Sequence, residues 1–147
     1  MDQAQEPTKN FGAYLDRTLK LIRQSYLQTF KEMGVNLTTE QWVLLDALHQ
    51  HDGISQNELA TKSFKNAPTV SRIIDLMCQK GFTERQRFDH DRRRYRIFLT
   101  AKGRSTYGLL KPAVDELREQ GWNGLTDDDY QHFLRIMNQL FDNFKGR

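Results

Sequence analysis

The chain has 147 residues, of which 37% are hydrophobic and 28% charged, and it is long enough for one module with a single core. No apolar run approaches the roughly 20 residues of a membrane-spanning helix. The formal net charge of +3 is unevenly distributed, because residues 62–104 hold twelve basic and four acidic side chains, a net charge of +8, while the rest of the chain carries −5. A single cysteine excludes an internal disulfide, and the lack of a secretory signal pattern predicts a cytoplasmic protein without a membrane partner.

The first two predicted elements are helices. Apolar residues from Phe11 to Met33 recur at spacings of three and four, which indicates an amphipathic helix that ends at Gly34. A second helix is expected to begin at Thr38, because Thr38 and Gln41 have the spacing of a capping box.

Two shorter helices follow, in the order of a helix-turn-helix. Ser55 begins the first of them with another capping-box signature. Asn66 is expected to cap the second, in which Pro68 lies in the first turn, where proline is tolerated.

After Gly81 the apolar period changes from 3.6 to 2, which is typical of strands. Strands are predicted at 83–88 and 95–100, joined by a long charged tip at 89–94. Three short helices followed by a hairpin predict a winged helix-turn-helix, a mainly α fold with a small β-hairpin wing.

The last two predicted elements are a helix over 101–122, capped by Thr100, and a helix that begins at Thr126 with acidic residues in its first turn. The apolar stripes at the two ends of the chain exceed what a small monomer can cover, so we expect dimerisation helices at 10–34 and 101–145. These helices flank a DNA-binding lobe at 36–100 within a single module spanning 1–147. Packing of both stripes into an internal core is the alternative.

The basic central segment offers two candidate contacts with double-stranded DNA. An α-helix fits the major groove, where asparagine suits adenine and arginine suits guanine, and a narrow arginine-bearing ribbon fits the minor groove. Asp91 is expected to orient the guanidinium of Arg93. The candidate DNA-binding residues are Ser55 (through its helix N-terminus), Lys62, Lys65, Asn66, Thr69, Ser71, Arg72, Asp91, Arg92, Arg93 and Arg94.

Four runs together resemble motifs of the MarR family of bacterial regulators: Thr69-Val70-Ser71-Arg72, Lys80-Gly81-Phe82, Asp91-Arg92-Arg93 and Leu99-Thr100-Ala101-Lys102-Gly103. The resemblance covers about residues 11–145. It implies a homodimer with interlocking terminal helices, two lobes that bind a palindromic operator, and entry of Arg93 into the minor groove. Phe88 departs from the family pattern, in which many members carry an acidic or polar residue before the wing.

Many members of that family bind a small aromatic or phenolic effector between the dimer helices and the lobe. Helix faces alone suggest five candidate ligand-binding residues: Tyr14, Arg17, Tyr26, Trp42 and Tyr107. The resemblance therefore implies a regulator, with repression as the expected direction, that a ligand releases from DNA.

The remaining candidate sites have structural interpretations. Cys78 is expected to be a buried, inert thiol, and His49 and His51 suit the C-terminus of a helix, since a zinc site would need further ligands such as His132. No catalytic triad, phosphate loop or nucleophile motif is present, so we expect neither an enzyme nor a cofactor. The alternative function is a protein-interaction module without sequence-specific DNA binding, whose basic wing meets an acidic partner.

Overall fold

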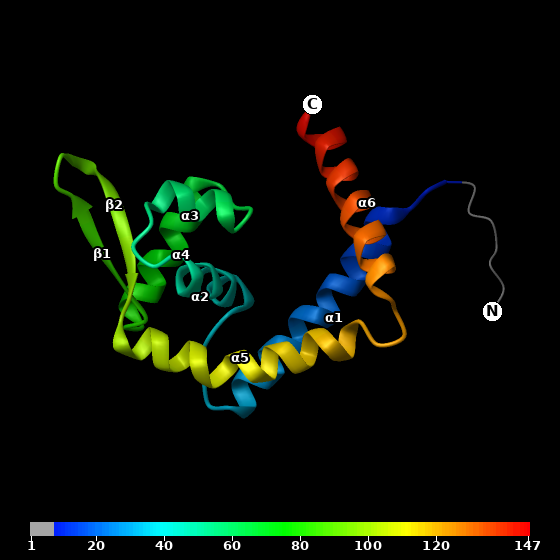
Figure 1. Ribbon diagram of the computed structural model, residues 1–147, viewed down its shortest axis with the longest axis horizontal. Helices are drawn as coiled ribbons and strands as arrows, with labels where there is room; N and C mark the ends of the chain where they lie inside the picture. Colours follow the sequence, from blue (N-terminus) through cyan, green and yellow to red (C-terminus); the bar gives the residue numbers. More distant parts are fainter. Residues whose placement is uncertain (1–7) are drawn as a thin grey trace. The chain divides into compact units, whose positions relative to one another are not determined.

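The structure is a computed structural model that describes residues 8–147, apart from the side chain of Arg92. Six helices and one two-stranded hairpin make up this part of the chain (Figure 1). In chain order the elements are α1 (Phe11–Glu32), α2 (Thr39–Gln50), α3 (Gln56–Lys62), α4 (Ala67–Gln79), β1 (Thr83–Phe88), β2 (Asp91–Leu99), α5 (Ala101–Gly121) and α6 (Asp127–Lys145). The predicted fold class is confirmed. No helix in the described part of the chain is long and apolar enough to cross a membrane.

The chain forms two compact units, one that ends at Val114 and one that comprises Asp115–Arg147. The first contains α1 to α4, the hairpin and the first part of α5, and the second contains the rest of α5 and α6. All of the candidate DNA-binding residues lie in the first unit.

Side-chain caps begin the helices of the winged lobe where the sequence predicts them. Thr38 and Gln41 form the expected reciprocal capping box, with hydrogen bonds of 3.1 and 3.2 Å. At α3 the Ser55 hydroxyl accepts the N–H of Glu58 at 3.1 Å, but no return bond from the Glu58 side chain is found among the described residues. The capping box predicted at Ser55 is therefore only half formed.

One hydrophobic core joins α2, α3, α4 and the base of the hairpin. The inward faces of α2 and α4 are apolar and almost wholly buried. They pack with residues from the ends of β2 and from α5. The fully buried side chains include Trp42, Leu45, Leu48, Leu59, Val70, Ile74, Met77, Ile97, Leu110 and Val114.

The start of α5 is fixed to the loop before β1 at very close range. The main-chain N–H of Thr100 donates to the carbonyl of Phe82 at 3.0 Å, and the Thr100 hydroxyl donates to the carbonyl of Gly81. The same hydroxyl accepts the N–H of Gly103 at 3.0 Å. A Cβ on Gly103 would lie only 2.1 Å from the carbonyl oxygen of Phe82, so this position has no space for a side chain.

The hairpin differs from the prediction at its end. Phe88 pairs with Asp91, whereas its neighbour Arg87 pairs with Tyr95. Residues 92–94 of β2 therefore have no partners in β1 and form a bulge. The turn is confined to residues 89–90, and the long charged tip predicted over 89–94 is wrong. A bulge leaves residues out of the ladder and re-aims their side chains, which charge patterning along the sequence does not reveal.

Candidate nucleic-acid interface

The N-terminus of α4 carries exposed polar residues, and its cap is formed by one of the predicted DNA contacts. The side-chain oxygen of Asn66 accepts the N–H of Thr69 at 2.9 Å, as predicted for the cap. A bidentate contact with adenine would require this oxygen to accept a second hydrogen bond. Arg72 is exposed one turn further along the helix, and Thr69 is half-buried.

Ser71 is engaged within the protein, and its predicted contact with a base stays a prediction. Its carbonyl accepts a hydrogen bond from the Arg85 guanidinium at 2.9 Å, and its hydroxyl lies 3.4 Å from the same nitrogen. These contacts with Arg85 show that β1 packs against the part of α4 that carries Ser71.

Arg85, which the sequence analysis did not assign, joins three elements of the lobe. Its guanidinium donates to the side chain of Gln56 on α3 at 3.1 Å and forms an ion pair with Asp75 on α4. With the bond to Ser71, one side chain of β1 thus holds both helices. Strand alternation could have found it, because Arg85 follows the buried Thr83 on the same face of β1.

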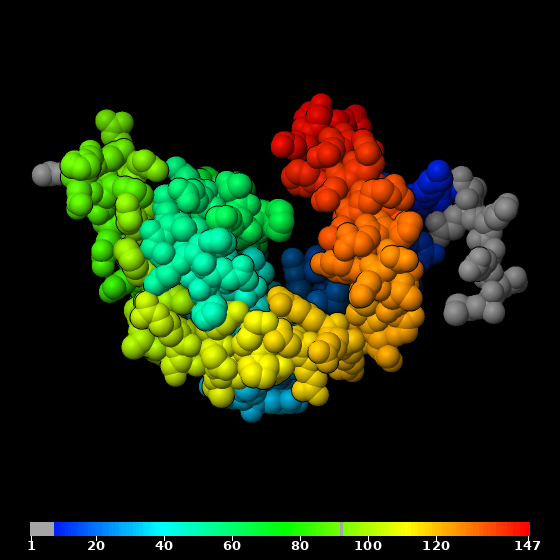
Figure 2. Space-filling view, in the orientation of Figure 1, coloured from blue at the N-terminus to red at the C-terminus, as the bar shows by residue number. Residues whose placement is uncertain are grey.

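The wing presents arginine side chains to solvent. Arg93 and Arg94 are exposed, and the hairpin, in green to yellow-green, forms one edge of the lobe (Figure 2). Asp91 was predicted to orient the guanidinium of Arg93. Its side chain instead accepts the main-chain N–H of Arg93 at 2.9 Å and so fixes the backbone of the bulge. The predicted contact of Arg92 lies outside the described side chains.

Phe88 supports the wing arginines, which explains its place in this chain. The guanidinium carbon of Arg94 lies 4.5 Å from the centre of the Phe88 ring, and that of Arg96 lies 4.6 Å from it. Cation–π contacts at this distance limit the freedom of both side chains. An aromatic side chain at position 88 therefore supports Arg94 and Arg96 together.

The remaining candidates lie around α3. Ser55 is 4% exposed and forms a bridge with Arg96, so its own side chain is not on the surface, and the contact predicted through the N–H groups of this helix N-terminus stays a prediction. The first residues of α3 nevertheless lie beside the wing, because Gln56, Arg93 and Arg94 line one hollow of about 60 Å³. Lys62 is exposed and Lys65 is half-buried in the turn that leads to α4.

That turn contains Phe64, a second residue that sequence reasoning missed. Phe64 is 95% exposed and has a φ of +58°. A left-handed conformation costs a residue other than glycine about 1–2 kcal/mol, and the exposed ring gains nothing within the chain. The flanking residues gave no signal of this conformation.

Replacement of Phe64 by glycine is expected to raise the free energy of unfolding by about 0.5–1 kcal/mol, because relief of the backbone strain exceeds the added entropy of the unfolded chain. Urea denaturation measures the change. Phe64→Ala removes the ring but keeps the strained backbone, and we expect its stability to match the wild type. A glycine variant no more stable than the alanine variant would show that the turn is unstrained.

The five candidate ligand-binding residues fall into two groups. Tyr26, Trp42 and Tyr107 belong to one aromatic cluster, in which Trp42 and Tyr107 stack with ring centres 5.1 Å apart. Tyr14 and Arg17 contact each other on the exposed part of α1, with the guanidinium 4.7 Å from the ring centre. The buried indole N–H of Trp42 has no hydrogen-bond partner among the described residues.

The cysteine and histidine side chains considered as reactive or metal-binding sites contact other residues of the protein. Cys78 is half-buried, with its sulfur 3.3 Å from the Thr83 hydroxyl, so it is less enclosed than predicted. His49 stacks on Tyr107, and Asp52 accepts the N–H of Leu99 at 2.8 Å. Within the part of the chain that is described, no three His, Cys, Asp or Glu side chains are grouped to hold a metal ion.

A lobe in which a helix-turn-helix is braced by an arginine-bearing hairpin defines the class of winged helix-turn-helix proteins. Comparison with known proteins narrows this class. Residues 37–95 match the model of the MarR family. The winged lobe therefore matches the MarR family, and solved structures that the chain resembles are transcriptional regulators of that family.

Solved structures agree with this assignment. A MarR transcriptional regulator from Methanosarcina mazei is 25% identical, with a TM-score of 0.73 over 94% of this chain and 99% of that one. The MepR–DNA complex of S. aureus is 24% identical, with a TM-score of 0.76 over 89% and 96%. BpsR of Bordetella bronchiseptica, whose DNA binding is regulated by 6-hydroxynicotinic acid, is 19% identical, with a TM-score of 0.79 over 95% and 98%. The last two show a common fold.

Proposed function

We propose that the protein is a homodimeric transcriptional repressor that binds a palindromic operator and leaves it when a small aromatic ligand binds. The observation that carries the proposal is the exposure, in one lobe, of Arg72 on α4 and of Arg93 and Arg94 on the wing. Arg72 is placed for base edges in the major groove, and the wing arginines for the minor groove beside it. The DNA complex of MepR, a protein of the same fold, supports this mode of binding.

The dimer is proposed from the two terminal helices, each taken by itself. No residue of α6 is buried, although Phe133, Phe141 and Phe144 are large and apolar, and Phe141 is 61% exposed. On α1, Leu21 is 65% exposed. Apolar stripes of this extent mark an interface, so residues 10–34 and 101–145 are assigned to dimerisation and residues 36–100 to DNA binding within one module of 147 residues.

Phe141→Glu is expected to convert the dimer into a monomer, because a carboxylate at the buried centre of an interface loses its hydration. Sedimentation equilibrium should give twice the 17.4 kDa chain mass for the wild type and the single mass for the variant. Phe64→Glu places the same charge on another exposed phenylalanine and should leave the dimer intact. A Phe141→Glu variant that remains dimeric contradicts this interface.

Selection of bound sequences from random DNA duplexes tests the main proposal. We expect an inverted repeat whose half-sites lie about one helical turn apart, with affinity that falls steeply as salt rises. Enrichment of no sequence, or binding without a preference over random duplex, would favour the protein-interaction module and contradict the repressor.

The effector is proposed to bind next to the aromatic cluster of Tyr26, Trp42 and Tyr107. The unpartnered indole N–H of Trp42 supports this site, because a buried donor without an acceptor is unfavourable and a ligand oxygen would satisfy it. The regulation of BpsR by 6-hydroxynicotinic acid gives a precedent for the ligand class in a protein of this fold.

A further inference from the structure

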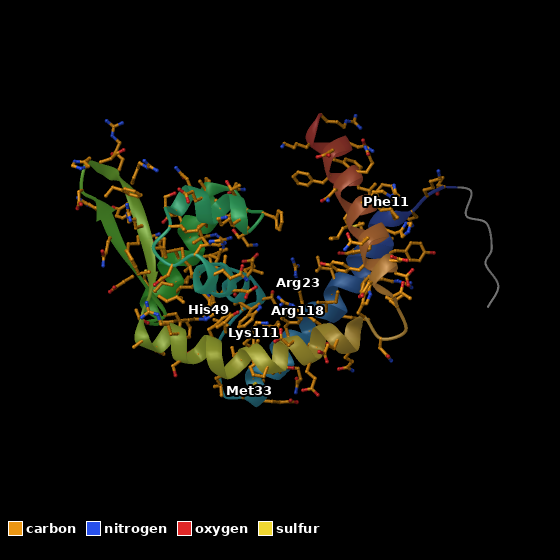
Figure 3. All side chains as sticks on the ribbon, viewed as in Figure 1. Phe11, Arg23, Met33, His49, Lys111 and Arg118 are labelled. Atoms are coloured by element: carbon orange, nitrogen blue, oxygen red, sulfur yellow. The ribbon has the colours of Figure 1, made fainter. Side chains whose placement is uncertain are left out.

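The turn between α3 and α4 holds Phe64 in a conformation from which the fold gains nothing. The ring is 95% exposed, and the backbone has a φ of +58°. Ser63 is the C-cap of α3, and the next position is the one where glycine or asparagine usually takes a left-handed conformation. The exposed side chains of α3 and of this turn project into solvent (Figure 3). A large residue that keeps a strained backbone at the surface is a candidate for a function outside the fold.

Hydrogen bonds fix the turn that carries this ring. The N–H of Phe64 donates to the carbonyl of Thr61 at 3.3 Å, and the N–H of Lys65 donates to the carbonyl of Ala60 at 2.9 Å. These two bonds are those of a Schellman motif, with phenylalanine at the position that glycine usually takes. The backbone that projects the ring is therefore ordered before a partner binds, which lowers the entropic cost of a contact.

The charge around the turn indicates which kind of partner the ring meets. Residues 59–74 carry three cations, Lys62, Lys65 and Arg72, and no acidic side chain. Lys62 is exposed and Lys65 is half-buried, one on each side of Phe64 in the sequence. A surface of this charge attracts a polyanion such as DNA, whereas the same turn of a second copy would be repelled.

Phe64 also lies close to the part of α4 that is assigned to the major groove. It precedes the cap residue Asn66 by two positions, so the Cα atoms of these residues are at most about 7.6 Å apart. The major groove of DNA is about 12 Å wide. When the N-terminus of α4 lies in the groove, the ring of Phe64 is therefore brought to the same groove.

The chemistry of the groove then selects what the ring contacts. Base edges in the major groove present hydrogen-bond donors and acceptors, and the 5-methyl group of thymine is the apolar group among them. We propose that Phe64 is a specificity-determining residue, whose ring packs on the 5-methyl group of one thymine in each operator half-site. This inference rests on the proposed function, because it requires sequence-specific binding to DNA.

Replacement of thymine by uracil in the operator tests the contact, because it removes the methyl group and leaves every hydrogen bond of the base pair in place. The operator is the sequence that the wild-type protein selects from random duplexes, and uracil replaces each thymine in turn, in both half-sites at once. At one thymine position we expect the wild-type affinity to fall about fifteenfold, the loss of one buried methyl group in each of two half-sites. Fluorescence anisotropy measures each affinity.

Variants of Phe64 connect this methyl group to the ring. Phe64→Ala should bind the thymine operator at least tenfold more weakly than the wild type, and it should bind the thymine and uracil operators equally. Its stability is expected to match the wild type, which separates the contact from folding. Phe64→Leu keeps an apolar side chain and should retain part of the preference for thymine. Affinity for random duplex and its salt dependence should be the same in all three proteins, because no phosphate contact is lost.

A wild-type affinity that depends on no thymine methyl group overturns the proposal, even if Phe64→Ala binds more weakly, because the ring would then contact deoxyribose. A Phe64→Ala variant that keeps the full preference for thymine also overturns it, since another residue would contact the methyl group. Loss of the dimer in Phe64→Ala would place the ring against a second copy and contradict the proposal as well. In each case the proposed function stands if Arg93→Ala weakens operator binding. If the wild type selects no operator, the proposed function and this contact fail together.

Discussion

Replacement of Gly103 by alanine is expected to destabilise the protein by about 3 kcal/mol or more. The new Cβ would lie 2.1 Å from the carbonyl oxygen of Phe82, which is main chain and cannot swing away. This steric overlap can be removed only if α5 moves away from the hairpin, and that movement would break the hydrogen bonds of Thr100 to Gly81 and Phe82. The midpoint of urea denaturation measures the loss.

Gly108→Ala is the matched control, since the same substitution in the same helix meets nothing within 4 Å. It should raise the free energy of unfolding by about 0.5–1 kcal/mol through helix propensity. If Gly103→Ala and Gly108→Ala have the same stability, the close approach of α5 to Phe82 is wrong.

The second large effect is expected from Arg93→Ala, which should weaken operator binding by about 1–3 kcal/mol with little change in melting temperature. Arg93 is exposed, and its side chain forms no hydrogen bond or ion pair with the described residues, whereas its main-chain N–H donates to Asp91. Fluorescence anisotropy at several salt concentrations measures the affinity, and the salt dependence should also become less steep.

Two variants make the Arg93 result specific. Arg147→Ala removes one positive charge at the end of α6 and should leave affinity unchanged. Arg85→Ala should lower both stability and affinity, because Arg85 binds Gln56, Ser71 and Asp75. An Arg93→Ala variant that binds as tightly as the wild type would remove the wing from the DNA interface.

Local sequence signals predicted the elements of the lobe well. The caps at Thr38 and Asn66 and the buried faces of α2 and α4 follow from residue spacing and hydrogen-bonding chemistry within a few residues. The order of these elements was sufficient to predict the winged helix-turn-helix. Helix caps and helix faces depend on residues only a few positions apart, so a single sequence is sufficient to predict them.

The errors arose where contacts join distant residues. The contact of Ser71 with Arg85 from β1 joins residues far apart in the sequence, and the spacing of residues within α4 did not indicate it. The tip of the wing was predicted to be long because a bulge at residues 92–94 resembles a charged loop in the sequence. The need for glycine at position 103 depends on Phe82, across the hairpin, and no local pattern indicates it.

The contacts of Arg85 restrict how the elements of this lobe can move relative to one another. Because α3, α4 and β1 share this one side chain, α4 cannot rotate while the wing stays in place. Under the proposed function, a ligand bound elsewhere would therefore move the lobe as a rigid body, and the spacing between the two lobes of a dimer, rather than the shape of either lobe, would change.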